Sequence, residues 1–143
     1  MDYLWLILAL LSAIAAAFVG IFAKIGLANI DTNTATAIRA IVMALFLILV
    51  VLTEGKLRAV GSIFSDMRTL FYIVLSGVAG ALSWLFYFLA LKLGKVSQVI
   101  PIDRLSIVFA IILAVLLLGE KFSWKMGVGS ALMAAGAILI ALP

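Results

Sequence analysis

Five long apolar runs dominate this sequence, and each is long enough to cross a membrane as a helix. The runs are Leu4–Ala23, Thr34–Leu52, Leu70–Leu91, Val99–Leu118 and Met126–Leu142. A membrane-spanning helix needs about 20 apolar residues, and in lipid every backbone N–H and C=O group must be paired within the protein. The alternating pattern of transmembrane β-strands is absent. The sequence therefore predicts an all-α integral membrane protein, with five transmembrane helices in a single domain over residues 1–143.

The composition agrees with a lipid-facing exterior. Hydrophobic residues make up 68% of the chain and charged residues only 11%, whereas a soluble domain of this length needs far more polar surface. The basic residues lie in short gaps between apolar runs, which favours contact with lipid headgroups over nucleic-acid binding. The first run follows an N-terminus without basic residues and is too long for the core of a signal peptide, so we expect it to be retained as a span.

Missing residue types limit the chemistry. The chain has no cysteine and no histidine, so disulfides, thiolate metal ligands and imidazole proton shuttles are excluded, and proton coupling would need a carboxylate. We find no nucleophile–base pair, no metal-ligand cluster and no glycine-rich loop beside a strand. We therefore expect neither an enzyme nor a bound cofactor or metal.

The connections bear on topology. The longest, Thr53–Thr69, mixes charges with Ile63, Phe64 and Met67, and either a brief amphipathic segment lying in the membrane interface or a solvated loop fits it. Five spans put the termini on opposite sides. The loops on the N-terminal side hold five basic residues against three on the other, or five against five when Arg39 and Arg104 are included. So small a bias permits insertion in both orientations.

Charged residues inside spans are the strongest functional signal. Each costs about 2.5–3.5 kcal/mol on insertion scales, so its presence needs a reason. The predicted topology brings together, on the side opposite the N-terminus, a set of charged, polar and aromatic residues: Lys24, Arg39, Ser83, Trp84, Tyr87, Asp103 and Arg104. One interpretation pairs Asp103 with Arg39 at a substrate or ion site. In the other, both arginines extend to the interface while Asp103 neutralises one of them, and Trp84 and Tyr87 belong to an interfacial aromatic belt.

Pro101 and the residues near Gly119 mark the ends of the fourth span. A proline inside a helix kinks the chain, as in transporters near binding sites, but a helix that begins at Val99 has Pro101 in its first turn, where proline is tolerated. Gly119 suits a left-handed C-cap, and Glu120 in the following turn fits a structural role better than ion coupling.

Small residues recur every four positions in the last span. Gly127, Ala131 and Ala135 let a second helix approach closely. This face is a candidate dimer interface, or else packs within the monomer.

Several stretches of the chain resemble the EamA domain of the drug/metabolite transporter superfamily. They are Ala23-Lys24-Ile25-Gly26-Leu27, Ala35-Thr36-Ala37-Ile38-Arg39, Ser83-Trp84-Leu85-Phe86-Tyr87-Phe88 with Ala90-Leu91, Pro101-Ile102-Asp103-Arg104-Leu105-Ser106 and Leu118-Gly119-Glu120-Lys121. Most members of that family carry two such five-helix units in inverted orientation. This chain has one, so the resemblance implies half of a ten-helix transporter, completed by a second copy.

The resemblance implies a secondary transporter that exports small metabolites or drugs as a homodimer, antiparallel if the chain inserts both ways, by alternating access. Asp103 is then the candidate proton or cation site, although a salt bridge would lower its pKa and argue against proton coupling. The alternative is a non-transporting subunit of a membrane hetero-oligomer. We expect a multi-pass protein of a prokaryotic inner or plasma membrane, with the lipid bilayer, a second copy and a small-molecule substrate as partners and no nucleic acid.

Overall fold

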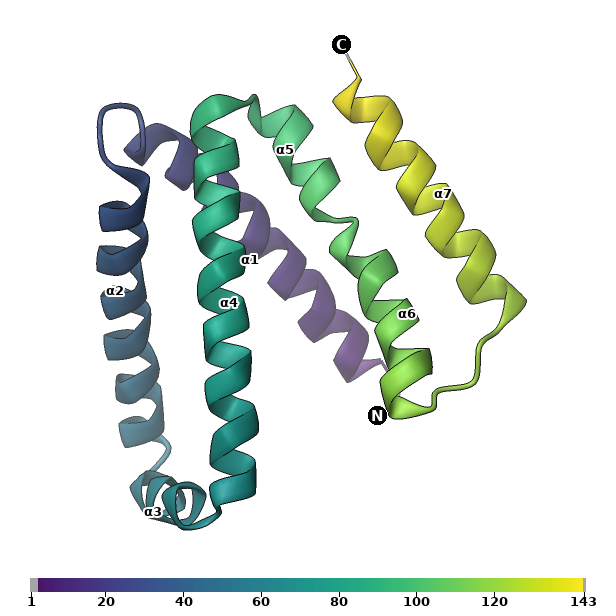
Figure 1. Ribbon diagram of the computed structural model, residues 1–143. Helices are drawn as coiled ribbons and strands as arrows, with labels where there is room; N and C mark the ends of the chain where they lie inside the picture. The colour runs from purple at the N-terminus through teal and green to yellow at the C-terminus, as the bar shows by residue number, and fades with distance from the viewer. Residues whose placement is uncertain (1–2, 143) are drawn as a thin grey trace. The chain divides into compact units, whose positions relative to one another are not determined.

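The computed structural model describes residues 3–142, and all the regular structure in that range is helical. The seven helices are α1 (Leu4–Gly26), α2 (Thr32–Thr53), α3 (Leu57–Ser65), α4 (Met67–Leu93), α5 (Val96–Asp103), α6 (Ser106–Leu118) and α7 (Trp124–Ala141), as labelled in Figure 1. Helices α5 and α6 together form one apolar segment, Val96–Leu118. With it, five segments are long and apolar enough to cross a membrane, which confirms the all-α, five-span fold class.

The chain divides into two compact units. One holds α2, α3 and α4 within Gly26–Lys92, and the other holds nearly all of α1 together with α5, α6 and α7. We call them the central unit and the terminal unit and describe each by itself.

In the central unit, the start of α2 and the end of α4 are the best-buried parts. Leu91 is fully buried, Phe88 and Leu27 nearly so, and the threonines of the first α2 turns, Thr32 and Thr36, are also buried. The Thr36 hydroxyl donates to the Thr32 carbonyl, 2.7 Å away, because a buried hydroxyl needs a partner. The ammonium of Lys92 donates to the Ile30 carbonyl at 3.0 Å, which ties the end of α4 to the loop before α2.

Two aspartates cap the long helices of the central unit. Asp31 has an extended backbone, and its carboxylate accepts from the Thr34 N–H at 2.8 Å and from the Thr34 hydroxyl at 2.9 Å. Asp66 does the same for α4, where it accepts from the Thr69 hydroxyl and the Arg68 N–H. These bonds satisfy donors that the first helical turn leaves unpaired.

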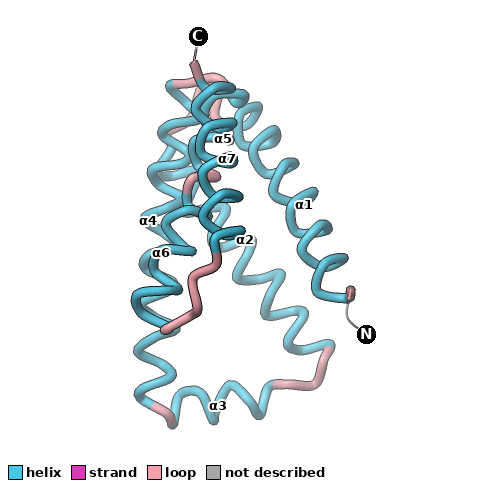
Figure 2. Tube along the Cα trace, turned by 90° about the vertical axis from the view of Figure 1, so that its right-hand side faces the viewer, coloured by secondary structure: helices cyan, strands magenta, loops and turns pink. Residues whose placement is uncertain are grey.

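Of the two interpretations of residues 53–69, the structure supports the amphipathic segment, which takes the form of helix α3. Helix α3 carries Leu57, Val60 and Phe64 on one side and exposes all three. Figure 2 shows it crossing between the end of α2 and the start of α4. Its location in a membrane interface stays a prediction.

In the terminal unit, α7 packs along α5 and, to a lesser extent, α6. The amide of Gln98 in α5 donates to the Ala141 carbonyl at the end of α7, 3.2 Å away, and the Lys24 ammonium donates to the Gly94 carbonyl just before α5, at 2.8 Å. Helix α6 ends at Gly119, whose φ of 68° lies in the left-handed region that glycine adopts without a steric penalty.

Candidate functional site

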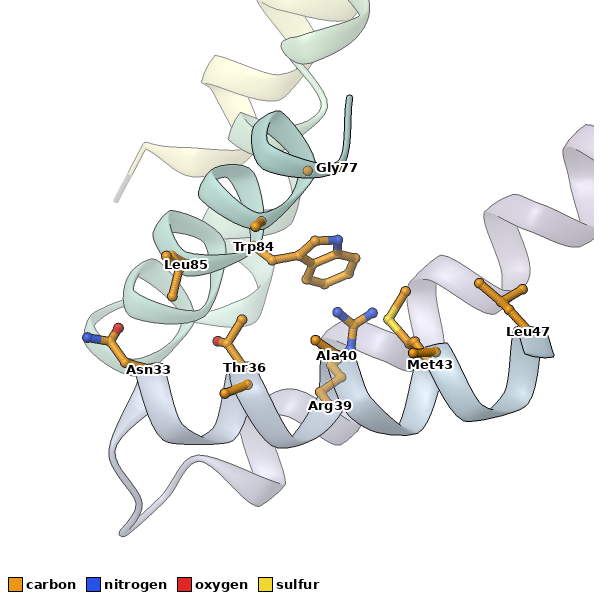
Figure 3. Close-up of a pocket in the computed structure, with 13 residues that line it drawn as sticks. Asn33, Thr36, Arg39, Ala40, Met43, Leu47, Gly77, Trp84 and Leu85 are labelled. Atoms are coloured by element: carbon orange, nitrogen blue, oxygen red, sulfur yellow. The ribbon is translucent and has the colours of Figure 1, made fainter. Parts of the chain in front are cut away.

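A cavity of about 530 Å³ lies between α2 and α4 of the central unit. Helix α2 lines it over about four turns, and α4 lines it with three small residues, Trp84 and Leu85 (Figure 3). The lining residues are Asn33, Thr36, Ala37, Arg39, Ala40, Met43, Ala44, Leu47, Gly77, Gly80, Ala81, Trp84 and Leu85. A Cβ built at Gly77 or Gly80 would meet nothing within 4 Å, so these glycines leave the α4 side of the cavity open.

Arg39 and Trp84 meet in this cavity. The guanidinium carbon of Arg39 lies 3.5 Å from the centre of the Trp84 ring and 5.4 Å from that of Phe88, and Figure 3 shows the guanidinium beneath the indole. A cation over an aromatic face is attracted by the ring quadrupole, by about 2 kcal/mol or more where water is excluded.

Neighbouring rings hold the indole in place. The Trp84 ring meets the rings of Tyr87 and Phe88 edge to face, with centroids 5.5 Å apart in both cases. Aromatic pairs prefer this geometry. Because Phe88 is buried, the cluster gives Trp84, and through it Arg39, a defined orientation.

The charge of Arg39 has no acidic partner within residues 26–92. The acidic side chains of that range are committed elsewhere: Asp31 and Asp66 cap helices, and Glu54 pairs with Lys56 at 2.7 Å. The guanidinium stays charged at any physiological pH. The cavity therefore holds a permanent cation among mostly apolar walls.

The other predicted site residues lie outside this cavity. Tyr87 contacts the Trp84 ring edge to face but does not line the cavity. Ser83 is exposed on another face of α4. Lys24 belongs to the terminal unit, where it binds the Gly94 carbonyl. Of the predicted set, the structure thus brings together Arg39 and Trp84, with Tyr87 beside them.

Sequence reasoning missed the residues of α2 that line the cavity around Arg39. Asn33, Thr36, Ala40, Met43 and Leu47 follow one another at intervals of three or four. That spacing places them on the same helix face as Arg39. Counting the helical period from Arg39 therefore predicts them.

The fourth span is interrupted where it carries its charges. Helix α5 begins at Val96, three residues earlier than predicted, so Pro101 lies inside it and not in its first turn. Proline has no N–H to donate to the carbonyl four residues back, and its ring crowds that carbonyl. Beyond it the helix tightens: Leu105 donates to Ile102 and Val108 donates to Leu105, each three residues back, the spacing of a 3₁₀ turn.

Asp103 and Arg104 lie at this interruption. Asp103 is the last residue of α5 and is half-buried, and Arg104 is its C-cap and is exposed. Both belong to the terminal unit and Arg39 belongs to the central unit, so the predicted Asp103–Arg39 pair stays a prediction.

The small-residue face of α7 divides into two parts. Ala131 and Ala135 are exposed. At Gly127, an added Cβ would meet the Phe122 ring at 2.8 Å, so a side chain of the same polypeptide covers this glycine. The side of α7 that is buried within its unit is a different one, centred on Ala137.

Among residues 3–142, no three His, Cys, Asp or Glu side chains come close enough together to hold a metal ion.

Comparison with known proteins decides the family. Residues 3–142 match the EamA-like transporter family. The chain belongs to that family. It is also 43% identical over 142 residues to a Sinorhizobium protein described as "Uncharacterized transporter in cobO 3'region", and the match covers 99% of each chain. No solved structure matches. As an EamA-like protein, the chain is a multi-pass membrane transporter.

Proposed function

We propose that two copies of this chain form a secondary transporter that exports small metabolites or drugs by alternating access across a prokaryotic inner membrane. The observation that carries the proposal is the cavity between α2 and α4, lined by Arg39 and Trp84. A charged group that is costly in lipid and lines a cavity marks a substrate pathway. Family membership supplies transport itself, and the bacterial relative supports the cell type.

Dimerisation is supported by the number of spans within residues 3–142 and by α7. Five spans offer few helices to enclose a pathway, whereas transporters of related design rock two units about a central site. Ala131 and Ala135 present an exposed small-residue face for a second copy. The nearly balanced basic residues permit that copy to be antiparallel.

The interruption between α5 and α6 supports the alternating-access part of the proposal. Discontinuous helices line the substrate and ion sites of many transporters, and Asp103 is a carboxylate next to such a break. We assign it the coupling-ion site. Arg104, beside it, is exposed and available to the same pathway.

The test of export needs no known substrate. Cells that express the chain alone are compared with cells that express Asp103→Asn, and the metabolites in the medium are measured by mass spectrometry. A set of small metabolites accumulates outside only with the wild-type chain if the proposal holds. Identical media, with both proteins present in the membrane, would favour the accessory-subunit alternative.

The test of assembly exploits the absence of cysteine. Ala131→Cys, near the middle of α7, should form a disulfide-linked dimer in oxidised membranes, because helices that cross near their middles bring this position together in either orientation. Leu132→Cys, one position round the helix, is the matched control. Reporter fusions at both termini then show whether one orientation or both occur, and a single orientation excludes the antiparallel form.

A further inference from the structure

We propose that the cavity between α2 and α4 binds a small monovalent organic carboxylate, which Arg39 holds by its carboxylate group and the apolar walls hold by its hydrocarbon part. The inference deepens the proposed function by naming the class of substrate, and it rests on that function.

The first step is charge. Arg39 is a permanent cation, and within residues 26–92 no carboxylate is paired with it. A charge beside apolar walls is stabilised when a counter-charge joins it. An anion entering the cavity gains this interaction, whereas a cation of similar shape is repelled.

The second step is geometry. The guanidinium carbon lies over the Trp84 ring, 3.5 Å from its centre, and a guanidinium carries five N–H donors in one fixed plane. Those donors form a fork that matches the two oxygens of a carboxylate. This cation–π contact holds the guanidinium in the cavity without a conventional hydrogen-bond acceptor (Figure 3).

The third step is the rest of the lining. Apart from Arg39, the polar residues are Asn33 and Thr36 together with the Trp84 ring nitrogen, and the Thr36 hydroxyl already donates to the Thr32 carbonyl. A phosphate or a dicarboxylate needs more charged donors than this cavity offers. A ligand with one carboxylate and an otherwise apolar body fits this cavity. Its volume of about 530 Å³ lies in the range of small-molecule sites.

The test is equilibrium binding to the purified protein in phosphatidylcholine nanodiscs. Trp5 and Trp124 are exposed and lie outside the cavity, so replacing both with phenylalanine leaves Trp84 as the single fluorescent reporter. Three probes of nearly equal shape are titrated: benzoate (anionic), benzamide (neutral) and benzylamine (cationic). Benzoate should change the Trp84 emission saturably, with an affinity about tenfold or more above that of the other two, as the loss of a charge-assisted hydrogen-bonded pair implies.

Two variants locate the effect. Arg39→Gln should weaken benzoate about tenfold or more and leave benzamide unchanged, and Arg39→Lys, which keeps the charge without the fork, should fall between. Arg58→Gln removes a basic residue of α3, outside the cavity, and should bind benzoate like the wild type.

Several results overturn the inference: no benzoate response in the wild-type protein, equal affinities for the three probes, benzoate binding that survives Arg39→Gln, or a response to phosphatidylglycerol in the nanodisc but not to benzoate. If Arg39→Gln does not fold, the ranking of the probes on the wild-type protein still decides. Binding needs neither a gradient nor a dimer. A protein that binds benzoate but exports nothing would refute the proposed function alone, and one that exports metabolites but prefers benzylamine would refute this inference alone.

Discussion

The guanidinium of Arg39 lies over the indole ring of Trp84, with 3.5 Å between the guanidinium carbon and the ring centre. The pair joins α2 to α4 across the cavity that both helices line. One contact thus sets the distance between the helices at that level and the direction of the only charged side chain among the lining residues.

Removing the indole should therefore loosen the central unit. Trp84→Ala deletes the ring over which Arg39 lies and the edge-to-face contacts with Tyr87 and Phe88, and we expect a loss of about 2 kcal/mol or more in stability. Trp84→Phe keeps a ring face for Arg39 and should lose less. Thermal unfolding of the purified protein in detergent measures both, and equal stability of Trp84→Ala and wild type would contradict a stabilising cation–π contact.

The cap of α2 predicts a pH dependence. The hydrogen bonds from Thr34, the backbone N–H first and the hydroxyl second, lower the pKa of Asp31 below its ordinary value. A carboxylate with a lowered folded pKa stabilises the protein above the unfolded pKa of about 3.9, and that contribution disappears as the pH falls through the folded pKa.

Asp31→Ala should accordingly have a lower melting temperature than wild type at pH 7, and the difference should shrink below pH 4. Asp31→Asn keeps a cap acceptor without a titrating group. Its residue 31 should therefore add no pH dependence to the melting temperature. A wild-type-to-alanine difference that is the same at pH 7 and pH 3 would refute the role of the ionised cap.

We expect alanine to affect stability differently at two glycines, one in the turn after α6 and one inside α7. Gly119 has φ 68°, so Gly119→Ala forces a side chain into the left-handed region, at a cost of about 1 kcal/mol. Gly129 lies inside α7, with open space where the methyl group of an alanine would lie, so Gly129→Ala should be neutral or stabilising, because alanine is the better helix former. Unfolding of the two variants side by side tests the turn, and a Gly119→Ala protein as stable as Gly129→Ala would contradict it.

Replacing the proline of the fourth span should raise stability and lower export. Pro101→Ala restores an N–H inside α5 and removes the ring, and we expect a gain in stability of up to about 3 kcal/mol, the cost of proline within a helix. If the interruption takes part in alternating access, metabolite export should fall in the same variant. A more stable protein with full export would show that the interruption is dispensable for transport.

Apolar length was enough to predict the spans, because lipid imposes helices on such segments. The residues of the site were harder. Arg39 stood out as a charge in a span, and Trp84 as a deep aromatic, but their contact depends on the rotation of α2 against α4, which composition does not encode. Apolar length does not locate the start of α5, because Ser97 and Gln98 are polar and the helix begins only after Lys95, which has the extended backbone of an N-cap. Phe122 over Gly127 was missed because the ring reaches back from a loop.

Helix α3 lines none of the cavity, yet it bears on the cavity's width. It crosses between the end of α2 and the start of α4 (Figure 2), and its nine residues extend about 13 Å at 1.5 Å per residue. At the opposite end of the same two helices, Lys92 and the loop at Ile30 are hydrogen-bonded. Helices α2 and α4 are thus separated by α3 at one end and joined by a hydrogen bond at the other. A shorter or longer α3 would therefore change the width of the cavity, and with it the size of ligand that fits, without any change in the lining residues.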